Sequence, residues 1–203
     1  MTDRQTRSHA AATVALACFA VVALGLLLMH GLRPDYELRS HMISDYAVGP
    51  HGGVMQGVFL TWSVGMAALA AALATCGTVS IPRGVGVLLL AVSAAGLVVS
   101  ALYKTDLPGM PDTAEGNIHG LSFLVNVASM LVAIPLLSWS FDARGGLAAH
   151  RPLALALAAG VVLGFVLQFF TLRKGMPYGL TNRLFVVVLL AWLLTTAYRL
   201  RRA

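Results

Sequence analysis

Charged residues are scarce in this sequence: Asp, Glu, Lys and Arg make up 11% of its 203 residues, whereas hydrophobic residues make up 58%. In a soluble domain about a quarter of the residues are charged, because the surface must face water. The mean hydropathy of +0.81 agrees with this imbalance. The composition therefore excludes a water-soluble globular domain and predicts a membrane protein whose apolar runs face lipid.

Cysteines are few, and the short motifs of several enzyme classes are missing. Cys18 and Cys76 each lie within an apolar run, where a cysteine behaves as a small hydrophobic residue. The sequence contains no CxxC, no HExxH and no GxSxG, which are typical of zinc or redox sites, zinc proteases and serine hydrolases. Basic residues exceed acidic ones by 14 to 8, but they are spread over the chain without forming a patch, so we predict no nucleic-acid partner.

Six apolar stretches are each long enough to cross a bilayer as a helix, which takes about 20 residues. They are 9–31, 53–76, 84–103, 118–139, 152–172 and 181–199, and the segments between them contain proline, glycine and charged residues. Strands of a membrane barrel would be about half as long and would alternate in polarity. We therefore predict an all-α, polytopic protein, a bundle of six transmembrane helices that forms one domain over residues 1–203.

The first apolar stretch follows Arg4 and Arg7, as the core of a secretory signal would. A cleavable signal has an apolar core of roughly 7–15 residues, and this stretch is longer. We expect a retained helix, no cleaved signal peptide, and a multi-pass protein of the cell membrane. With both termini cytoplasmic, eight basic residues lie inside and six outside, a bias that favours this orientation.

Polar residues gather in the loops predicted to be outside. In "RSHMISDYAVGPHGG" (residues 39–53), His41, Ser44 and Asp45 are spaced so that they share one side of a short helix. One interpretation is an interfacial helix in which Ser44 or Asp45 serves as a cap. The other is one wall of a pocket, since a carboxylate near the membrane boundary is costly without a partner.

The second outer loop adds Asp106, which follows the third span, and His119, which opens the fourth. His119, Ser122, Asn126 and Ser129 form a polar stripe, and helix packing alone would explain most of it. Histidine serves both as an acid/base and as a metal ligand. The candidate catalytic residues are therefore His41, Ser44, Asp45, Asp106 and His119.

These residues leave the cofactor open. A set of Ser, His and Asp could form a nucleophile system, and histidines with a carboxylate could hold zinc, with Asp45, Asp106 and His119 as candidate ligands. A haem would need two histidines on facing helices at matched depth, which we do not favour. In the third outer loop, Arg173, Lys174 and Arg183 could hold a lipid phosphate or could anchor helix ends at the membrane surface.

Short segments around these residues resemble a prokaryotic six-span membrane family known as the domain of unknown function 998. The segments are "LRPDY", "ISDYAVG", "ALYKTDLPG" and "NIHG". The resemblance covers nearly the whole chain and implies a six-helix membrane protein in which Ser44, Asp45, Asp106 and His119 recur, without an established activity. The family usually has an aromatic residue and proline before the acidic residue, where this chain has "YKTD".

Three functions are compatible with these features. We favour an enzyme acting on a lipid or lipid-linked substrate at the outer leaflet, because ionisable groups converge at one membrane level. In that hypothesis His119 is the acid/base, Asp45 and Asp106 orient groups or bind metal, and Ser44 is a nucleophile or hydrogen bonder. The alternatives are a ligand-binding or transport protein and an accessory subunit of a membrane complex. The sequence identifies no protein partner.

Overall fold

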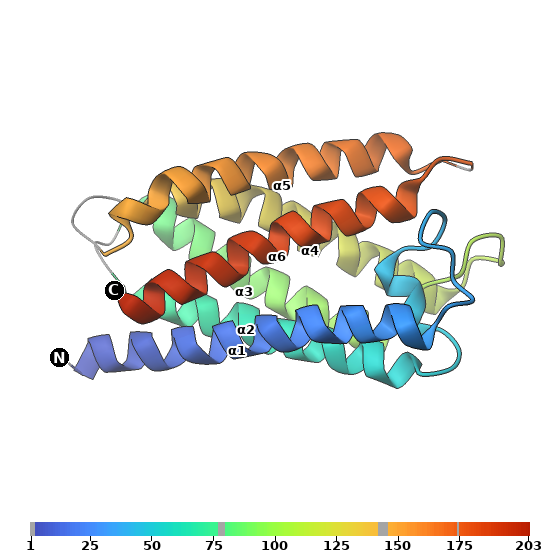
Figure 1. The fold of residues 1–203 in the computed structure, drawn as a ribbon, viewed down its shortest axis with the longest axis horizontal. Helices are drawn as coiled ribbons and strands as arrows, with labels where there is room; N and C mark the ends of the chain where they lie inside the picture. Colours follow the sequence, from blue (N-terminus) through green and yellow to red (C-terminus); the bar gives the residue numbers. More distant parts are fainter. Residues whose placement is uncertain (1–2, 77–79, 142–145, 174) are drawn as a thin grey trace.

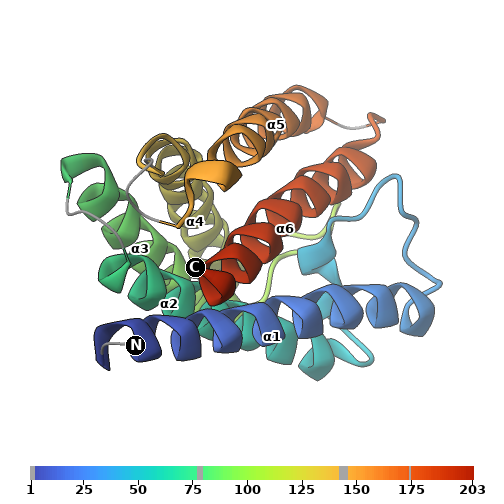
Figure 2. The ribbon, with the colours of Figure 1, turned by 60° about the vertical axis from the view of Figure 1, so that its left-hand side comes forward.

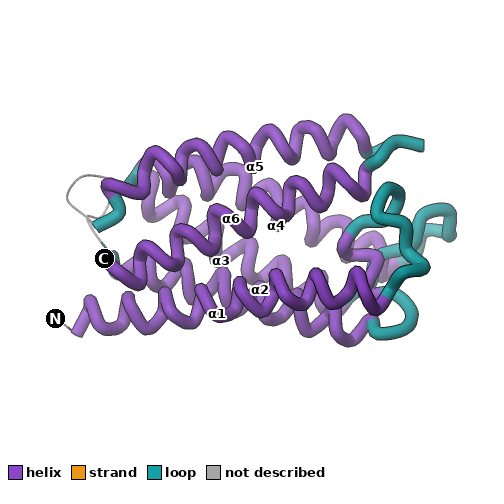
Figure 3. Tube along the Cα trace, in the orientation of Figure 1, coloured by secondary structure: helices purple, strands orange, loops and turns teal. Residues whose placement is uncertain are grey.

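Six long α-helices make up most of the computed structural model, which describes residues 3–76, 80–141, 146–173 and 175–203 (Figure 1). They are α1 (Asp3–Leu32), α2 (Gly52–Thr75), α3 (Ile81–Leu102), α4 (Ala114–Trp139), α5 (Arg151–Thr171) and α6 (Tyr178–Arg202). Two short 3₁₀-helices, η1 (Ile43–Ala47) and η2 (Ala148–His150), complete the regular structure. Within the described ranges there is no strand (Figure 3).

The prediction of six membrane-spanning helices is confirmed. Each helix contains an 18-residue window of mean hydropathy between 1.7 and 2.6, with length and composition suited to crossing a bilayer. Several helices begin before the predicted apolar runs: α1 at Asp3, α4 at Ala114 and α6 at Tyr178. The apolar pattern omits these first turns because they contain polar residues, which lie at a helix end without disturbing the span.

The helices pack mainly against their neighbours in the chain. α1 contacts α2 and α6, α3 lies between α2 and α4, and α5 packs on α6 and α4. Figure 2 shows α5 and α1 on opposite sides of α6. Side chains such as Phe19, Met66 and Trp192 form the apolar core, whereas Leu27 and Leu163 are more than 60% exposed. In a bilayer these side chains face lipid, so their exposure requires no protein partner.

Small and hydroxylated residues join the helices inside the bundle. Ser63 on α2 donates a hydrogen bond to the Ala94 carbonyl of α3 over 2.7 Å. A Cβ atom at Gly164 on α5 would lie 3.3 Å from Cα of Phe185 on α6, so the two backbones approach closely there. These contacts are typical of helix packing in membranes.

The three loops that precede α2, α4 and α6 gather at one end of the bundle, which we call the three-loop end (Figures 1 and 3). Both chain termini lie at the opposite end. The first loop, residues 33–51, contains η1, four of whose five residues are buried. The candidate polar residues of the sequence therefore lie at or near one end of the molecule.

Candidate functional site

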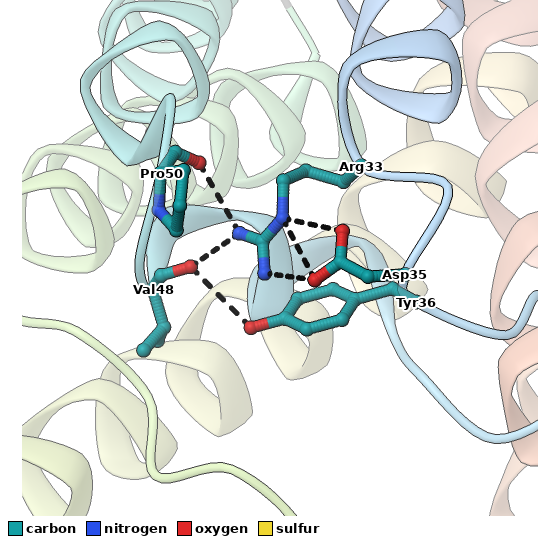
Figure 4. A network of polar contacts seen from close by, with 5 residues as sticks. All are labelled: Arg33, Asp35, Tyr36, Val48 and Pro50. Atoms are coloured by element: carbon teal, nitrogen blue, oxygen red, sulfur yellow. Dashed lines mark hydrogen bonds and ion pairs between the residues drawn. The ribbon is translucent and has the colours of Figure 1, made fainter.

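Arg33 fixes the first loop from within (Figure 4). Its Nε and Nη2 donate to the two carboxylate oxygens of Asp35 over 2.9 and 2.8 Å. Its Nη1 donates to the carbonyl oxygens of Val48, over 2.5 Å, and Pro50, over 3.2 Å. The guanidinium also lies 3.8 Å from the centroid of the Tyr36 ring. Arg33 therefore ties the beginning of the loop to the segment that leads into α2, and its hydrogen bonds lower the pKa of the Asp35 carboxyl.

Arg183, near the start of α6, fixes the same loop from outside it. Its Nε donates to Nε2 of His30 on α1 over 2.8 Å. Its Nη1 donates to the carbonyl oxygens of His41, over 2.6 Å, and Leu38, over 3.2 Å. Its Nη2 donates to the Tyr46 hydroxyl over 2.8 Å. One side chain thus joins α1, α6, the first loop and η1.

The first turn of α6 also approaches the loop backbone closely. The N–H of Gly179 donates to the Arg39 carbonyl over 2.9 Å. A Cβ atom at Gly179 would lie 2.9 Å from the backbone nitrogen of His41, closer than real contacts allow. On the next turn of α6, Oδ1 of Asn182 accepts a hydrogen bond from the N–H of Ile43 over 3.1 Å. The loop is therefore held against α6 at several points.

Asp45 is the buried carboxylate of η1, with 4% of its surface exposed. Its Oδ2 accepts a hydrogen bond from the N–H of Met42 over 3.0 Å and caps η1. Among the described residues, no group donates a hydrogen bond to Oδ1. Burial raises the pKa of Asp45 to about 6, although the Met42 N–H and the charges of His41 and Arg183 act in the opposite direction. The pKa of Asp45 therefore lies near 6, and one carboxylate oxygen is available to a ligand.

Asp45 opens into a cavity of about 860 Å³ at the three-loop end. We call this cavity the outer pocket. It is built from all three loops and combines charged, hydroxyl and apolar side chains, among them Glu37, Arg39, Ser44, Asp45, Asp106, Leu172, Arg173 and Met176. A volume of this size is typical of a small-molecule site.

Asp106 contributes to the outer pocket, but its carboxylate is also bound within the second loop. Thr113 donates to it twice over 2.8 Å, from its N–H to Oδ2 and from its hydroxyl to Oδ1. The Thr113 hydroxyl in turn accepts a hydrogen bond from the N–H of Gly116 and caps α4. Asp106 thus lies at the N-terminus of α4, where a negative charge is favourable.

His119 lies at a different cavity from Asp45 and Asp106. It is buried, its Nδ1 lies 2.8 Å from the Tyr103 carbonyl oxygen, and it does not line the outer pocket. Instead it lines a smaller cavity of about 50 Å³ inside the bundle, which we call the inner cavity. The polar side chains around the inner cavity are Ser44, Trp62, Ser100, His119, Asn126 and Asn182. The structure therefore does not bring Asp106 and His119 into one pocket.

The other residues predicted from the sequence lie in different parts of the three-loop end. Ser44 lines both the outer pocket and the inner cavity. His41 is half-buried and does not line the outer pocket. Its ring stacks on Tyr36 with 4.5 Å between centroids. Arg173 is exposed at the outer pocket, and Lys174 lies outside the described residues. Arg183 does not line the outer pocket; with His30 it forms the polar end of an apolar groove of about 480 Å³ between α1 and α6.

The candidate zinc ligands are similarly dispersed. In the part of the chain that the structure describes, no three His, Cys, Asp or Glu residues form a group able to hold a metal ion. Asp45 and Asp106 share the outer pocket, while His119 lies at the inner cavity. The geometry therefore separates His119 from the two carboxylates.

Several residues of the site are not among the candidates that the sequence predicts. Arg33 belongs to "LRPDY", a charged segment at a helix end that also suits membrane anchoring. Trp62 and Asn182 lie within or beside apolar runs, where the period of a helix is hidden. An asparagine at the start of a span is one available signal, because a polar side chain in a membrane helix usually faces the bundle interior.

The fold and its buried polar groups define an integral membrane protein with six helices and a pocket at one end. A family model described as "Protein of unknown function (DUF998)" matches residues 15–199. The chain belongs to this family, as the resemblance of its loop segments predicts. No curated protein and no solved structure matches the chain.

Proposed function

We propose that this membrane protein binds the head group of a phosphate-bearing lipid or lipid-linked compound in the outer pocket. The three-loop end then faces the outside of the cell membrane, as the distribution of basic residues predicts. The observation that carries the proposal is the Asp45 carboxyl, buried in η1 with an oxygen that no described group binds. A buried carboxylate is costly unless it is paired, so a ligand that donates a hydrogen bond or carries an ammonium group suits it.

The rest of the outer pocket fits a molecule that is polar at one end and apolar at the other. Arg173 offers a guanidinium, which binds phosphate through two parallel hydrogen bonds. Leu172 and Met176, in the third loop, are exposed apolar side chains of the same pocket. The proposed arrangement places a hydroxyl or ammonium group at Asp45, the phosphate at Arg173, and the beginning of the apolar chain beside the third loop.

Lipid titration of the detergent-purified protein, followed by native mass spectrometry, tests this arrangement. Phosphatidylethanolamine offers both an ammonium group and a phosphate, whereas phosphatidic acid offers the phosphate alone. We expect Asp45→Asn to remove the preference for phosphatidylethanolamine, and Arg173→Gln to weaken binding of both lipids. The matched controls are Asp112→Asn and Lys104→Gln, at exposed positions that do not line the pocket. Unchanged binding in both pocket variants would overturn the proposal.

Catalysis on the bound lipid is a second candidate function, and the pKa of Asp45 favours it. A general acid/base is most effective when its pKa lies near the working pH, and that of Asp45 is raised to about 6. Asp45 rather than His119 is then the acid/base, because Asp45 lines the outer pocket and His119 does not. Ser44, which faces both cavities, is the candidate nucleophile.

Turnover separates this second function from binding alone. Lipids of several head-group classes are incubated with the protein, and their products are followed by mass spectrometry. If the protein is an enzyme, Ser44→Ala abolishes turnover while lipid binding is retained, and Asp45→Asn removes the inflection of the pH–rate profile near pH 6. Turnover that is equal in the wild type and both variants would contradict these roles.

A further inference from the structure

Trp62 presents a buried hydrogen-bond donor inside the membrane-spanning part of the bundle. The side chain is 4% exposed, lines the inner cavity, and its Nε1 has no hydrogen-bond partner in the structure. Trp62 lies ten residues into α2, which corresponds to a depth of about 15 Å from the three-loop end. At that depth lipid offers no acceptor, so the indole N–H depends on what the cavity contains.

Two amides border the same cavity as Trp62. Oδ1 of Asn126 accepts a hydrogen bond from the Ser93 hydroxyl, and Oδ1 of Asn182 accepts one from the N–H of Ile43. Neither side-chain nitrogen donates a hydrogen bond within the described ranges, and both asparagines line the inner cavity. Donors from α2, α4 and α6 therefore border one small space.

His119 can supply an acceptor at the same cavity. Its Nδ1 lies within hydrogen-bond distance of the Tyr103 carbonyl, so this nitrogen carries the proton in the neutral ring. Nε2 is then the acceptor. The Ser44 hydroxyl, which can both donate and accept, closes the cavity on the side of η1.

We propose that the inner cavity is a water-filled compartment connected to the outer pocket through Ser44. A cavity of about 50 Å³ has room for a few water molecules and is too small for a lipid head group. Water can accept hydrogen bonds from the indole and amide N–H groups and can donate one to His119. No single protein group in the described structure does both. The water forms a hydrogen-bonded path from the outer pocket to the middle of the bundle. This inference does not depend on which lipid the outer pocket binds.

The chain contains its own control for a test of hydration. Trp192 is fully buried, and its Nε1 donates to the Ser138 hydroxyl over 2.9 Å. Trp139 is the third tryptophan of the sequence, so protein labelled with ¹⁵N-tryptophan gives three indole signals. Trp→Phe variants assign each signal to its residue. Transfer of micelle-embedded protein into D₂O then measures the exchange of each N–H.

We expect the Trp62 indole to exchange about tenfold or more faster than that of Trp192, and to show magnetisation transfer from water. Ser44→Val should slow the exchange of Trp62 without affecting Trp192. Ser40→Val is the matched control, because Ser40 lines only the outer pocket. Equal protection of Trp62 and Trp192 would overturn the hydrated compartment, and fast exchange that Ser44→Val leaves unchanged would overturn the connection through Ser44. Lipid binding plays no part in either readout.

Discussion

Nε of Arg183 donates a hydrogen bond to Nε2 of His30 over 2.8 Å, and Nδ1 of the same histidine lies 2.6 Å from the Leu26 carbonyl oxygen. An arginine always donates, so Nε2 must be the acceptor and Nδ1 must carry the proton. The imidazole is therefore held in one tautomer, between a helix carbonyl and a cation. This pair is the point at which α1, α6 and the first loop meet.

Arg183→Lys should destabilise the protein by about 3 kcal/mol. A lysine keeps the charge but cannot reach His30, the loop carbonyls and Tyr46 together, and the loss of hydrogen bonds to a charged group costs about 1.5–3 kcal/mol. Thermal unfolding in detergent measures the loss, and protease cleavage of the first loop shows where it occurs. Arg173→Lys, at an exposed position, is the control and should change stability by less than about 0.5 kcal/mol.

Arg33→Met should loosen the connection between the first loop and α2. The substitution removes the donors to the Val48 and Pro50 carbonyl oxygens while keeping an apolar side chain over Tyr36. We expect faster amide exchange over residues 48–54, measured by hydrogen–deuterium exchange, and a loss of about 2 kcal/mol. Exchange in α5, which lies away from the loop, serves as the internal reference. Unchanged exchange at residues 48–54 would show that Arg33 does not hold the loop.

The stability of the protein should depend on the protonation of Asp45. The folded-state pKa of about 6 lies above the ordinary value of 3.8, so the folded protein binds the proton more tightly than the unfolded chain. This contribution is fully present below about pH 4 and is lost as the pH rises through about 6. A rise from 3.8 to about 6 corresponds to about 3 kcal/mol.

Unfolding of the wild type and of Asp45→Asn across this pH range checks the prediction. The asparagine keeps an oxygen for the Met42 N–H and does not titrate. The difference in the free energy of unfolding between the two proteins should therefore change by about 3 kcal/mol between about pH 4 and 7. Asp112→Asn, on the exposed part of the second loop, should give no such change. A difference that is constant with pH would contradict the burial of a titrating Asp45.

Two glycines of α4 should respond in opposite directions to alanine. A Cβ atom at Gly116 would collide with the Asp106 carboxylate, whereas one at Gly120 would meet nothing within 4 Å. Gly116→Ala should therefore displace Asp106 from Thr113 and destabilise the protein by about 1–3 kcal/mol. Gly120→Ala should stabilise it by up to about 1 kcal/mol through helix propensity. Melting of both variants in the same detergent gives the comparison, and equal effects would show that Asp106 is not fixed against α4.

The six helices could be predicted because each apolar run is long and lipid imposes one solution on its backbone. The separation of the candidate residues into the outer pocket and the inner cavity could not be predicted in the same way. Asp106 and His119 are both adjacent to the second loop in the sequence, but α4 begins at Ala114, which places His119 more than one turn inside the helix. In a span that is apolar on all sides, the pattern does not fix which side faces the bundle. Loop contacts such as the hydrogen bond from Arg33 to the Val48 carbonyl depend on the path of the loop backbone. The spacing of residues in the sequence does not predict that path.

The contacts of Arg183 also have a consequence for how the protein is made. Two of its partners leave the ribosome long before it does, since His30 precedes Arg183 by 153 positions and Tyr46 precedes it by 137. During synthesis the first two helices therefore enter the membrane before the side chain that closes their connecting loop exists. Completion of the outer pocket becomes a late event of biogenesis, and a nascent chain arrested before α6 would present this loop open to proteases and quality-control factors.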